Sequence, residues 1–390
     1  MTKKAEKIDL SDISNELSFL LFILREAKER DEQRMREYAS KTKWDSFIQL
    51  ALHHRVYPIV YSKLSQIRSS CIPADVMETL RYHYNANVLK MMQLTREMNT
   101  ICGRLSAGGI RTLILKGPVL AVQLYGDMAH RTSKDLDILI DIEDLESAEE
   151  AMAQLGYIAE DKPTAKPNWK KKTHHLSFWH KEKAVQVEVH WRINPYSGGG
   201  THSFGQLWER RNTVDIMNLS FHCLGNDDLL YYLADHGARH AWFRLRWLVD
   251  IDRLIPRLNV DEMLVYLRKH GGQSFAGQAF LLSEQLLHSK LPSSMDGLTN
   301  NKKTIRLART SLFFLKRIVK LNPVPEKSVV WPYFRYSLSL MTGRQRARYL
   351  LNHLEPNGKD MSQLPLYKPL HFLYFPLRPF LWFWRHIINN

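Results

Sequence analysis

Apolar residues recur at helical spacing through much of the first hundred positions of the chain. One such run follows the capping candidates Ser11 and Asp12, and residues 44–52 repeat its character. Residues 73–109 open with a proline and acids and close on two glycines, which is how a long helix begins and ends. We therefore interpret residues 1–109 as an N-terminal helical region that serves as scaffold. The first run consists of Leu17, Leu20, Leu21, Ile23 and Leu24.

The pattern changes after position 109, where short apolar runs alternate with helical segments. Residues 110–116 predict a strand, and a short helix with a proline at its start follows. Residues 135–141, DLDILID, predict a second strand, and the acidic segment EDLESAEEAMAQLG predicts a helix. A third strand is predicted at residues 184–193, AVQVEVHWRI, beyond a basic, histidine-bearing connection at residues 161–183. This order of elements is typical of a small α/β unit, which we place at residues 110–200.

The chain is predicted to be helical again from about residue 224, in NDDLLYYLADHGARHAWFRLRWLVDIDRLI and in VDEMLVYLRKHG. We expect residues 201–300 to form a helical region that packs on the preceding unit, and residues 301–390 to form a basic, aromatic-rich C-terminal region. Residues 366–388 hold many aromatics but also three prolines, so they do not predict one clean spanning helix. Such a segment suits a membrane boundary, or it folds back onto its own core.

Length and charge add a prediction about partners. At 390 residues the chain is long enough for two or three packed units. Its net charge of +15 is concentrated in residues 302–390, which hold 16 Lys+Arg and three acids. Such a field attracts nucleic acid, an anionic membrane surface or a phosphorylated substrate, although a solvated basic surface is the alternative.

Cellular location follows from what the chain lacks. The N-terminal residues turn acidic and amphipathic after their lysines, a pattern that does not predict a signal peptide. No stretch reaches the roughly 18 charge-free apolar residues of a spanning helix. The three cysteines are scattered and show no disulfide or zinc spacing. We therefore expect a cytoplasmic protein, or one that is peripheral to the inner face of the membrane.

Two carboxylates share one face of the predicted strand at residues 135–141. Strand periodicity places Asp135 and Asp137 on one side, while the intervening Leu and Ile residues point to the other. Glu188 lies on the polar side of the third strand. Like charges this close need a cation or screening water, and oxygen ligands suit Mg²⁺ or Mn²⁺. We predict that all three are catalytic metal ligands for phosphoryl or nucleotidyl transfer; an exposed strand face without metal is the alternative.

The sequence around these acids resembles the signature of the DNA polymerase beta-like nucleotidyltransferase superfamily. It is most similar to a large, poorly characterised bacterial family of nucleotidyltransferases within it. In that family an acidic-x-His-Trp element supplies the third carboxylate, and Glu188 occupies that position here. The similarity spans roughly residues 15–260. The matching segments are LILKGP at 113–118, Tyr125, Arg131, DLDIL at 135–139 and EVHW at 188–191, with helical flanks at 51–56 and 236–250.

The resemblance implies an α+β fold, in which a small nucleotidyltransferase-type mixed sheet with helices is flanked by N-terminal and C-terminal helical regions. It also implies an enzyme that moves a nucleoside monophosphate from a nucleoside triphosphate (NTP) to an unidentified acceptor and releases pyrophosphate, with Mg²⁺ or Mn²⁺. The alternative is a non-catalytic nucleotide- or polyanion-binding regulator or adaptor on the same fold.

The loop before the first helix of this unit departs from the broader superfamily. Pro118 follows Gly117 where Ser or Gly is usual, and proline has no N–H to donate. We therefore predict Lys116 as the phosphate contact at this loop, with Gly117, Arg131 and Lys134 as further nucleotide-binding residues. Charge balance against nearby acids is the alternative for the last two.

Four histidines receive no catalytic role from the sequence. His236 and His240 have the i, i+4 spacing at which two imidazoles can share a metal, but no third ligand lies nearby in sequence. We expect them to pack beside the catalytic unit. His174 and His175 lie in the basic connection, for which a surface role is the interpretation.

Overall fold

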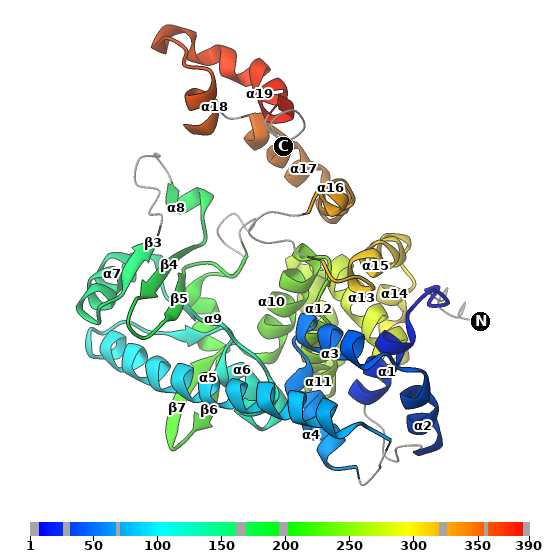
Figure 1. The fold of residues 1–390 in the computed structure, drawn as a ribbon. Coiled ribbons are helices and arrows are strands. Elements are labelled where there is room, and N and C mark those ends of the chain that lie inside the picture. Colours follow the sequence, from blue (N-terminus) through cyan, green and yellow to red (C-terminus); the bar gives the residue numbers. More distant parts are fainter. Residues whose placement is uncertain are drawn as a thin grey trace. The chain divides into compact units, whose positions relative to one another are not determined.

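The computed structural model describes residues 8–25, 32–67, 71–160, 169–194, 202–319, 326–354 and 358–384 (Figure 1). The chain divides into two compact units, Met1–Tyr333 and Phe334–Asn390. Helix α15 (Lys302–Leu315) belongs to the larger unit, because it packs against α13 (Gln273–Leu282) and Leu307 O accepts a hydrogen bond from Gln278 Nε2. The boundary between the two compact units lies between Tyr333 and Phe334.

The N-terminal part of the larger unit is helical, as the apolar spacing predicts. Helix α1 is capped by Ser14, whose Oγ accepts from Leu17 N at 3.1 Å, so the predicted caps Ser11 and Asp12 are wrong. Helix α5 runs for 34 residues and ends where Gly109 adopts a φ of 76°. The helices are α1 (Asn15–Leu24), α2 (Glu32–Lys41), α3 (Trp44–His53), α4 (Tyr57–Ser65) and α5 (Ala74–Ala107).

A seven-stranded mixed sheet follows, with the strand order β3-β4-β5-β2-β1-β7-β6. Strand β2 pairs in parallel with β5, and β1 pairs in parallel with β7, while the other pairs are antiparallel. The predicted α+β class, a mixed sheet flanked by helices, is confirmed. The strands are β1 (Leu113–Ile114), β2 (Asp135–Leu139), β3 (Ile158–Glu160), β4 (His175–His180), β5 (Val185–His190), β6 (Asn212–Ile216) and β7 (Leu219–Cys223).

Three of these strands, β1, β2 and β5, were predicted, and the other four were not. Strand β4 lies inside the segment that was interpreted as a connection. Strands β6 and β7 lie between α9 (Phe204–Glu209) and α10 (Asn226–Arg239), in a segment expected to be helical. The β6–β7 turn was hard to recognise because Met217 and Asn218 both adopt positive φ, at 51° and 63°, without a glycine.

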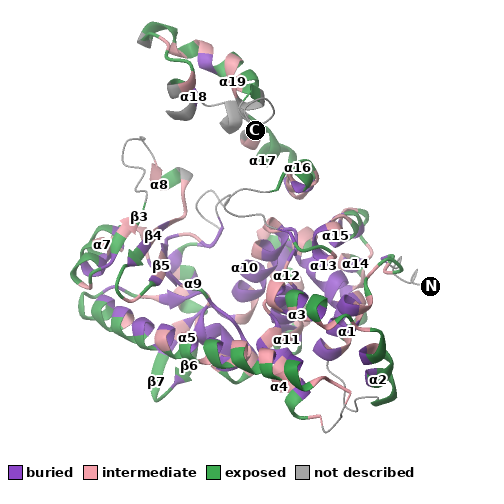
Figure 2. Ribbon diagram, viewed as in Figure 1, coloured by how far each residue is buried: buried purple, intermediate pink, exposed green. Residues whose placement is uncertain are grey.

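One face of the sheet forms the main core of this part of the chain. Alternate residues of β2 and β5 point into it, as predicted, and helices α5 and α7 (Leu145–Gln154) cover it (Figure 2). The residues between them point to the opposite face, which leaves that face for polar side chains. The core residues from the two strands and the segment after β2 are Leu136, Ile138, Ile140, Val185, Val187 and Val189.

The other elements of the described chain are helices. After β7, helical structure begins again at Asn226, close to the predicted residue 224. Among the described helices none combines the length and the apolar content that crossing a membrane requires. The remaining helices are α6 (Pro118–Tyr125), α8 (Trp169–Lys172), α9 (Phe204–Glu209), α10 (Asn226–Arg239), α11 (Leu245–Leu254), α12 (Val260–His270), α14 (Asp296–Thr299), α16 (Lys327–Leu340), α17 (Gly343–Leu354), α18 (Gly358–Gln363) and α19 (Tyr374–Phe383).

Candidate active site

The register between β2 and β5 brings the predicted carboxylates together. Asp137 pairs with Glu188 across the two strands, and Asp135 pairs with Gln186. Paired residues of neighbouring strands point to the same face, so all three carboxylates lie on the face opposite the apolar core. His190, two residues after Glu188, shares that face.

His190 binds two of the carboxylates. Its Nε2 lies 3.1 Å from Asp137 Oδ1 and 3.2 Å from Glu188 Oε2. Burial disfavours the charged imidazole, but the hydrogen bonds to both carboxylates outweigh burial and raise the pKa of His190. Burial also opposes ionisation of Asp137, yet the Lys116 ammonium and the hydrogen bond from His190 hold the pKa of Asp137 well below its usual value.

Asp135 has the opposite electrostatic balance. Burial and the neighbouring Asp137 carboxylate both raise the pKa of Asp135, and the attraction of Lys116 only partly offsets them. The two aspartates, two positions apart on one strand, are thus not equivalent. An additional cation at this position would favour the ionised form of Asp135.

Lys116 lies beside the carboxylates, at the end of β1. Its Nζ is 3.7 Å from Asp137 Oδ1, 3.5 Å from His236 Nδ1 and 5.1 Å from the centre of the Tyr232 ring. The strand pairing fixes this position, because Leu115 N donates to Asp137 O at 2.9 Å. Gly117 then turns the chain into α6 with a φ of 78° and a ψ of −146°, a conformation open to glycine and costly for other residues.

Arg131, predicted as a nucleotide-binding residue, is buried and paired inside the protein. Its Nε and Nη2 donate to the two carboxylate oxygens of Asp250 at 2.9 and 3.0 Å. The Tyr125 hydroxyl donates to the same carboxylate at 2.7 Å. Arg131 is 1% exposed and Asp250 is 0% exposed. The alternative of charge balance therefore fits Arg131, but its partner is Asp250 rather than an acid near it in sequence.

Several cations surround Asp135. Attraction by Asp135 favours the charged forms of Arg55, Lys134 and Arg246. Lys134 is exposed, and the like charge of Arg55 is the main reason its pKa is lowered. Arg55 adopts a left-handed φ of 55°, which is uncommon for a residue with a side chain and is often found at functional sites. Arg244 contributes to the same positive field and lowers the pKa of Lys134 further.

The surface role assigned to His174 and His175 is wrong. His175 begins β4 directly opposite His190, and its Nε2 lies 3.9 Å from Glu188 Oε2. His174 Nε2 lies 3.2 Å from His175 Nδ1, and burial is the main cause that lowers the pKa of His174 to about 2. In HLSFWH the apolar residues Leu176 and Phe178 are two positions apart and both buried, and this period of two was the sequence signal for the strand.

His236 and His240 pack beside the site, as predicted. Their rings are 4.7 Å apart, and each lies 5.3 Å from the Trp247 ring. Burial lowers the pKa of both. His236, on α10, contacts Lys116.

Two sets of side chains in the described part of the chain could hold a metal ion. One consists of Asp137, Glu188 and His190, and the other consists of His174, His175 and His190. In each set the candidate ligand atoms all lie within 4.8 Å of one another. His190 is common to both.

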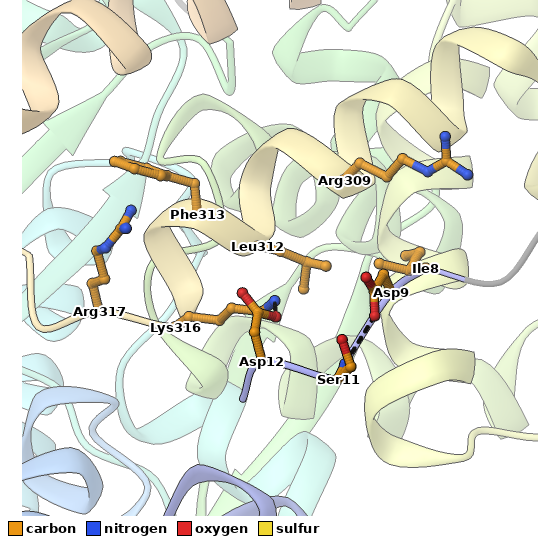
Figure 3. A pocket seen from close by; sticks show the side chains of 9 residues that line it. All are labelled: Ile8, Asp9, Ser11, Asp12, Arg309, Leu312, Phe313, Lys316 and Arg317. Atoms are coloured by element: carbon orange, nitrogen blue, oxygen red, sulfur yellow. Dashed lines mark hydrogen bonds and ion pairs between the residues drawn. The ribbon is translucent and has the colours of Figure 1, made fainter. Parts of the chain in front are cut away.

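A cavity of about 720 Å³ lies elsewhere in the larger unit, between the N-terminal residues and α15 (Figure 3). Lys316, at the end of α15, pairs there with Asp12. None of the predicted site residues lines this cavity. The lining residues are Ile8, Asp9, Ser11, Asp12, Arg309, Leu312, Phe313, Lys316 and Arg317.

A mixed sheet with carboxylates on neighbouring strands and a lysine beside them agrees with the class of nucleotidyltransferases, a group of transferases. Residues 40–288, well over half of the chain, match the model of a family described as uncharacterised nucleotidyltransferase, and the chain belongs to that family. The resemblance inferred from the motifs is thereby confirmed. Such an enzyme takes a nucleotide and an acceptor as substrates, and nucleotidyltransferases generally use a divalent metal.

Two further comparisons were made. A search of curated proteins found none that matches the chain. Among solved structures, the lincosamide antibiotic adenylyltransferase LnuA with lincomycin bound is similar at 17% sequence identity, over 41% of this chain and 94% of that chain, with a TM-score of 0.29.

Proposed function

We propose that the chain transfers a nucleoside monophosphate from an NTP to a hydroxyl, phosphate or protein acceptor and releases pyrophosphate. The observation that carries this proposal is the β2–β5 register, which sets Asp135, Asp137 and Glu188 on one face of two adjacent strands. Lys116 beside Asp137 adds a cation of the kind that binds phosphate oxygens.

The carboxylates fit a divalent metal. Oxygens of Asp137 and Glu188 both contact His190 Nε2, at 3.1 and 3.2 Å, and the candidate ligand atoms of these three residues lie within 4.8 Å of one another. The raised pKa of Asp135 indicates a carboxylate whose charge is incompletely compensated. Mg²⁺ or Mn²⁺ held by the three acids would supply charge stabilisation at the phosphate and activate the acceptor.

The residues of the chain have distinct roles in the proposed transfer. The acceptor oxygen bonds to the α-phosphorus as the bond from that phosphorus to the bridging oxygen breaks, and pyrophosphate leaves. Glu188 accepts the proton of the acceptor. Lys116 binds phosphate oxygens, and Gly117 allows close approach because it has no side chain.

A group of cations supports binding of the triphosphate. Asp135 attracts Arg55 and Lys134, and Arg244 is close enough to Lys134 to lower its pKa. Lys134 is exposed. We assign these side chains to the phosphates of the leaving pyrophosphate. Arg131 is given a positioning role instead, since Asp250 occupies its guanidinium.

We further propose that residues 302–390 attract an anionic partner, a nucleic acid, a phosphorylated substrate or an anionic membrane surface. The support is charge, with 16 Lys+Arg against three acids. The smaller unit adds exposed aromatic side chains, with Phe372 64% and Phe380 72% exposed. Binding of the full chain to RNA, to DNA and to anionic vesicles should weaken as salt rises. Binding to none of them would refute a nucleic acid and a membrane surface as the partner.

Pyrophosphate release tests the proposed function. The full chain is incubated with each of the four NTPs and Mg²⁺ or Mn²⁺, with cell extract as the source of acceptor. Release should be lost in Asp135→Asn and Asp137→Asn while the circular dichroism spectrum is retained. Asp215→Asn on β6 is the matched control, because it changes a strand aspartate whose partner is Ser220, and it should keep full turnover. Equal turnover in the Asp137 variant would refute the proposal.

A further inference from the structure

Three histidines meet next to the carboxylates. His175 of β4 is directly opposite His190 of β5, and their ring centres are 4.9 Å apart. His174 precedes β4. Its backbone is fixed against the residue after β5, because the His174 carbonyl accepts a hydrogen bond from Trp191 N at 3.0 Å. One ring nitrogen of each histidine lies within 4.8 Å of those of the other two.

The hydrogen bonds of His190 determine which of its nitrogens is available. Nε2 lies at hydrogen-bond distance from Asp137 and Glu188, so it carries a proton that it donates to them. Nδ1 is buried and has no hydrogen-bond partner. A histidine that ligates a metal commonly donates its other N–H to a carboxylate, which orients the ring and fixes the tautomer. His190 has this arrangement at Nε2, and its Nδ1 is the ring nitrogen without a hydrogen-bond partner.

The distance between two of the donor atoms agrees with a metal site. His174 Nε2 and His175 Nδ1 are 3.2 Å apart. Ligands at about 2.0–2.1 Å from one ion are separated by roughly 2.9–3.4 Å in octahedral or tetrahedral geometry. The pair is therefore already spaced like two ligands of one ion.

The chemistry of the donors selects the kind of metal. Imidazole nitrogens suit Zn²⁺ and its neighbours among the transition metals, whereas Mg²⁺ prefers oxygen ligands. A three-nitrogen set of this kind differs from the oxygen set of Asp135, Asp137 and Glu188. Three protein ligands also leave a coordination position open for water or another group.

We propose that His174, His175 and His190 form a second metal site that binds a divalent transition metal, with Zn²⁺ as the ion of best fit. The site lies against the carboxylates, and His190 is the residue that it shares with the set of Asp137 and Glu188. Its occupation stiffens the contact between β4 and β5 at the active site. The inference rests on the geometry of the histidines and on the carboxylate contacts of His190, and it does not depend on nucleotidyl transfer.

Direct metal binding tests this site. The full chain is prepared without a histidine tag, stripped with a chelator and titrated with Co²⁺ and Zn²⁺, with the visible absorption of bound Co²⁺ and the retained Zn²⁺ as readouts. The variants are His174→Ala/His175→Ala and, because His190 is buried, the milder His190→Gln. His222→Ala on β7 is the matched histidine control, and Asp135→Asn removes a carboxylate outside the set.

Intact protein should bind one Zn²⁺ or Co²⁺ that millimolar Mg²⁺ does not displace. Both histidine variants should weaken this binding by at least about tenfold, and His222→Ala and Asp135→Asn should leave it unchanged. Unaltered affinity in His174→Ala/His175→Ala would overturn the proposal. Displacement by Mg²⁺, or loss in Asp135→Asn alone, would place the ion on the carboxylates and also overturn it. If the intact chain releases no pyrophosphate, the proposed function is refuted, and the result on metal binding still stands.

Discussion

Replacing Asp250 with asparagine separates a structural role of Arg131 from a role in nucleotide binding. The Arg131 guanidinium is 1% exposed and binds both oxygens of Asp250. Asp250→Asn keeps the size of the side chain and one acceptor for Tyr125, but removes the negative charge. The buried guanidinium is then left without a counter-ion.

The cost follows from burial. Removing one partner of a buried ion pair costs about 3–5 kcal/mol, because the remaining charge is neither solvated nor paired. Net stabilities are typically about 5–15 kcal/mol, so Asp250→Asn should remove a large fraction of the free energy of unfolding. The double variant Arg131→Met/Asp250→Leu removes both charges and should recover most of this loss. It still deprives Tyr125 of its acceptor, at about 1–3 kcal/mol.

Urea unfolding of the full chain, followed by far-ultraviolet circular dichroism, measures these differences. Asp252→Asn is the matched control on the same helix, because asparagine retains an acceptor for Ser289, and it should cost about 1 kcal/mol or less. A loss below about 1 kcal/mol in Asp250→Asn would refute the buried-pair reasoning. If Arg131→Met at the same time weakened nucleotide binding in a fully stable protein, Arg131 would return to the phosphate-binding residues.

Three further predictions concern the site and its surroundings. Lys116→Met should lower kcat/KM for the NTP by roughly 10- to 100-fold in a pyrophosphate assay, since a hydrogen bond to a charged group contributes about 1.5–3 kcal/mol; an unchanged kcat/KM would contradict its role. Gly117→Ala should lower the free energy of unfolding by about 1–3 kcal/mol in urea melts, because its φ of 78° is strained for alanine, and full stability would argue against that strain. Burial lowers the pKa of His54. The contribution of the neutral imidazole to the free energy of unfolding is therefore fully present above about pH 6.5. It decreases by about 1.4 kcal/mol for each pH unit below that value. Urea melts from pH 7 to pH 5 should therefore show a shallower decline in His54→Asn, and equal slopes would contradict the assignment.

Much of the face that carries the carboxylates could be predicted because its signal is local. In β2 and β5 every second residue is apolar and buried, so the positions between them had to share the other face. Asp135, Asp137 and Glu188 occupy such positions, and a two-residue period reports this without any knowledge of the fold. Their roles as metal ligands stay a prediction.

The partners of these residues could not be predicted, because they come from distant parts of the chain. Arg131 and Asp250 are 119 residues apart, and nothing near Arg131 in sequence indicates that Asp250 is its partner. Lys116 meets His236 across 120 residues. An arginine beside two aspartates therefore looked like a phosphate ligand until its true partner was known.

His174 and His175 show the same limit from another side. Their residue type and basic surroundings favoured an exposed loop, and only the pairing of β4 with β5 sets them against His190 and Glu188. The sequence by itself determined which residues face each side of β2 and β5, because alternation is a property of a single strand. The tertiary structure alone decided which strands are neighbours, in which register, and which distant side chains neutralise the buried charges, because those contacts depend on how the whole sheet and its helices pack.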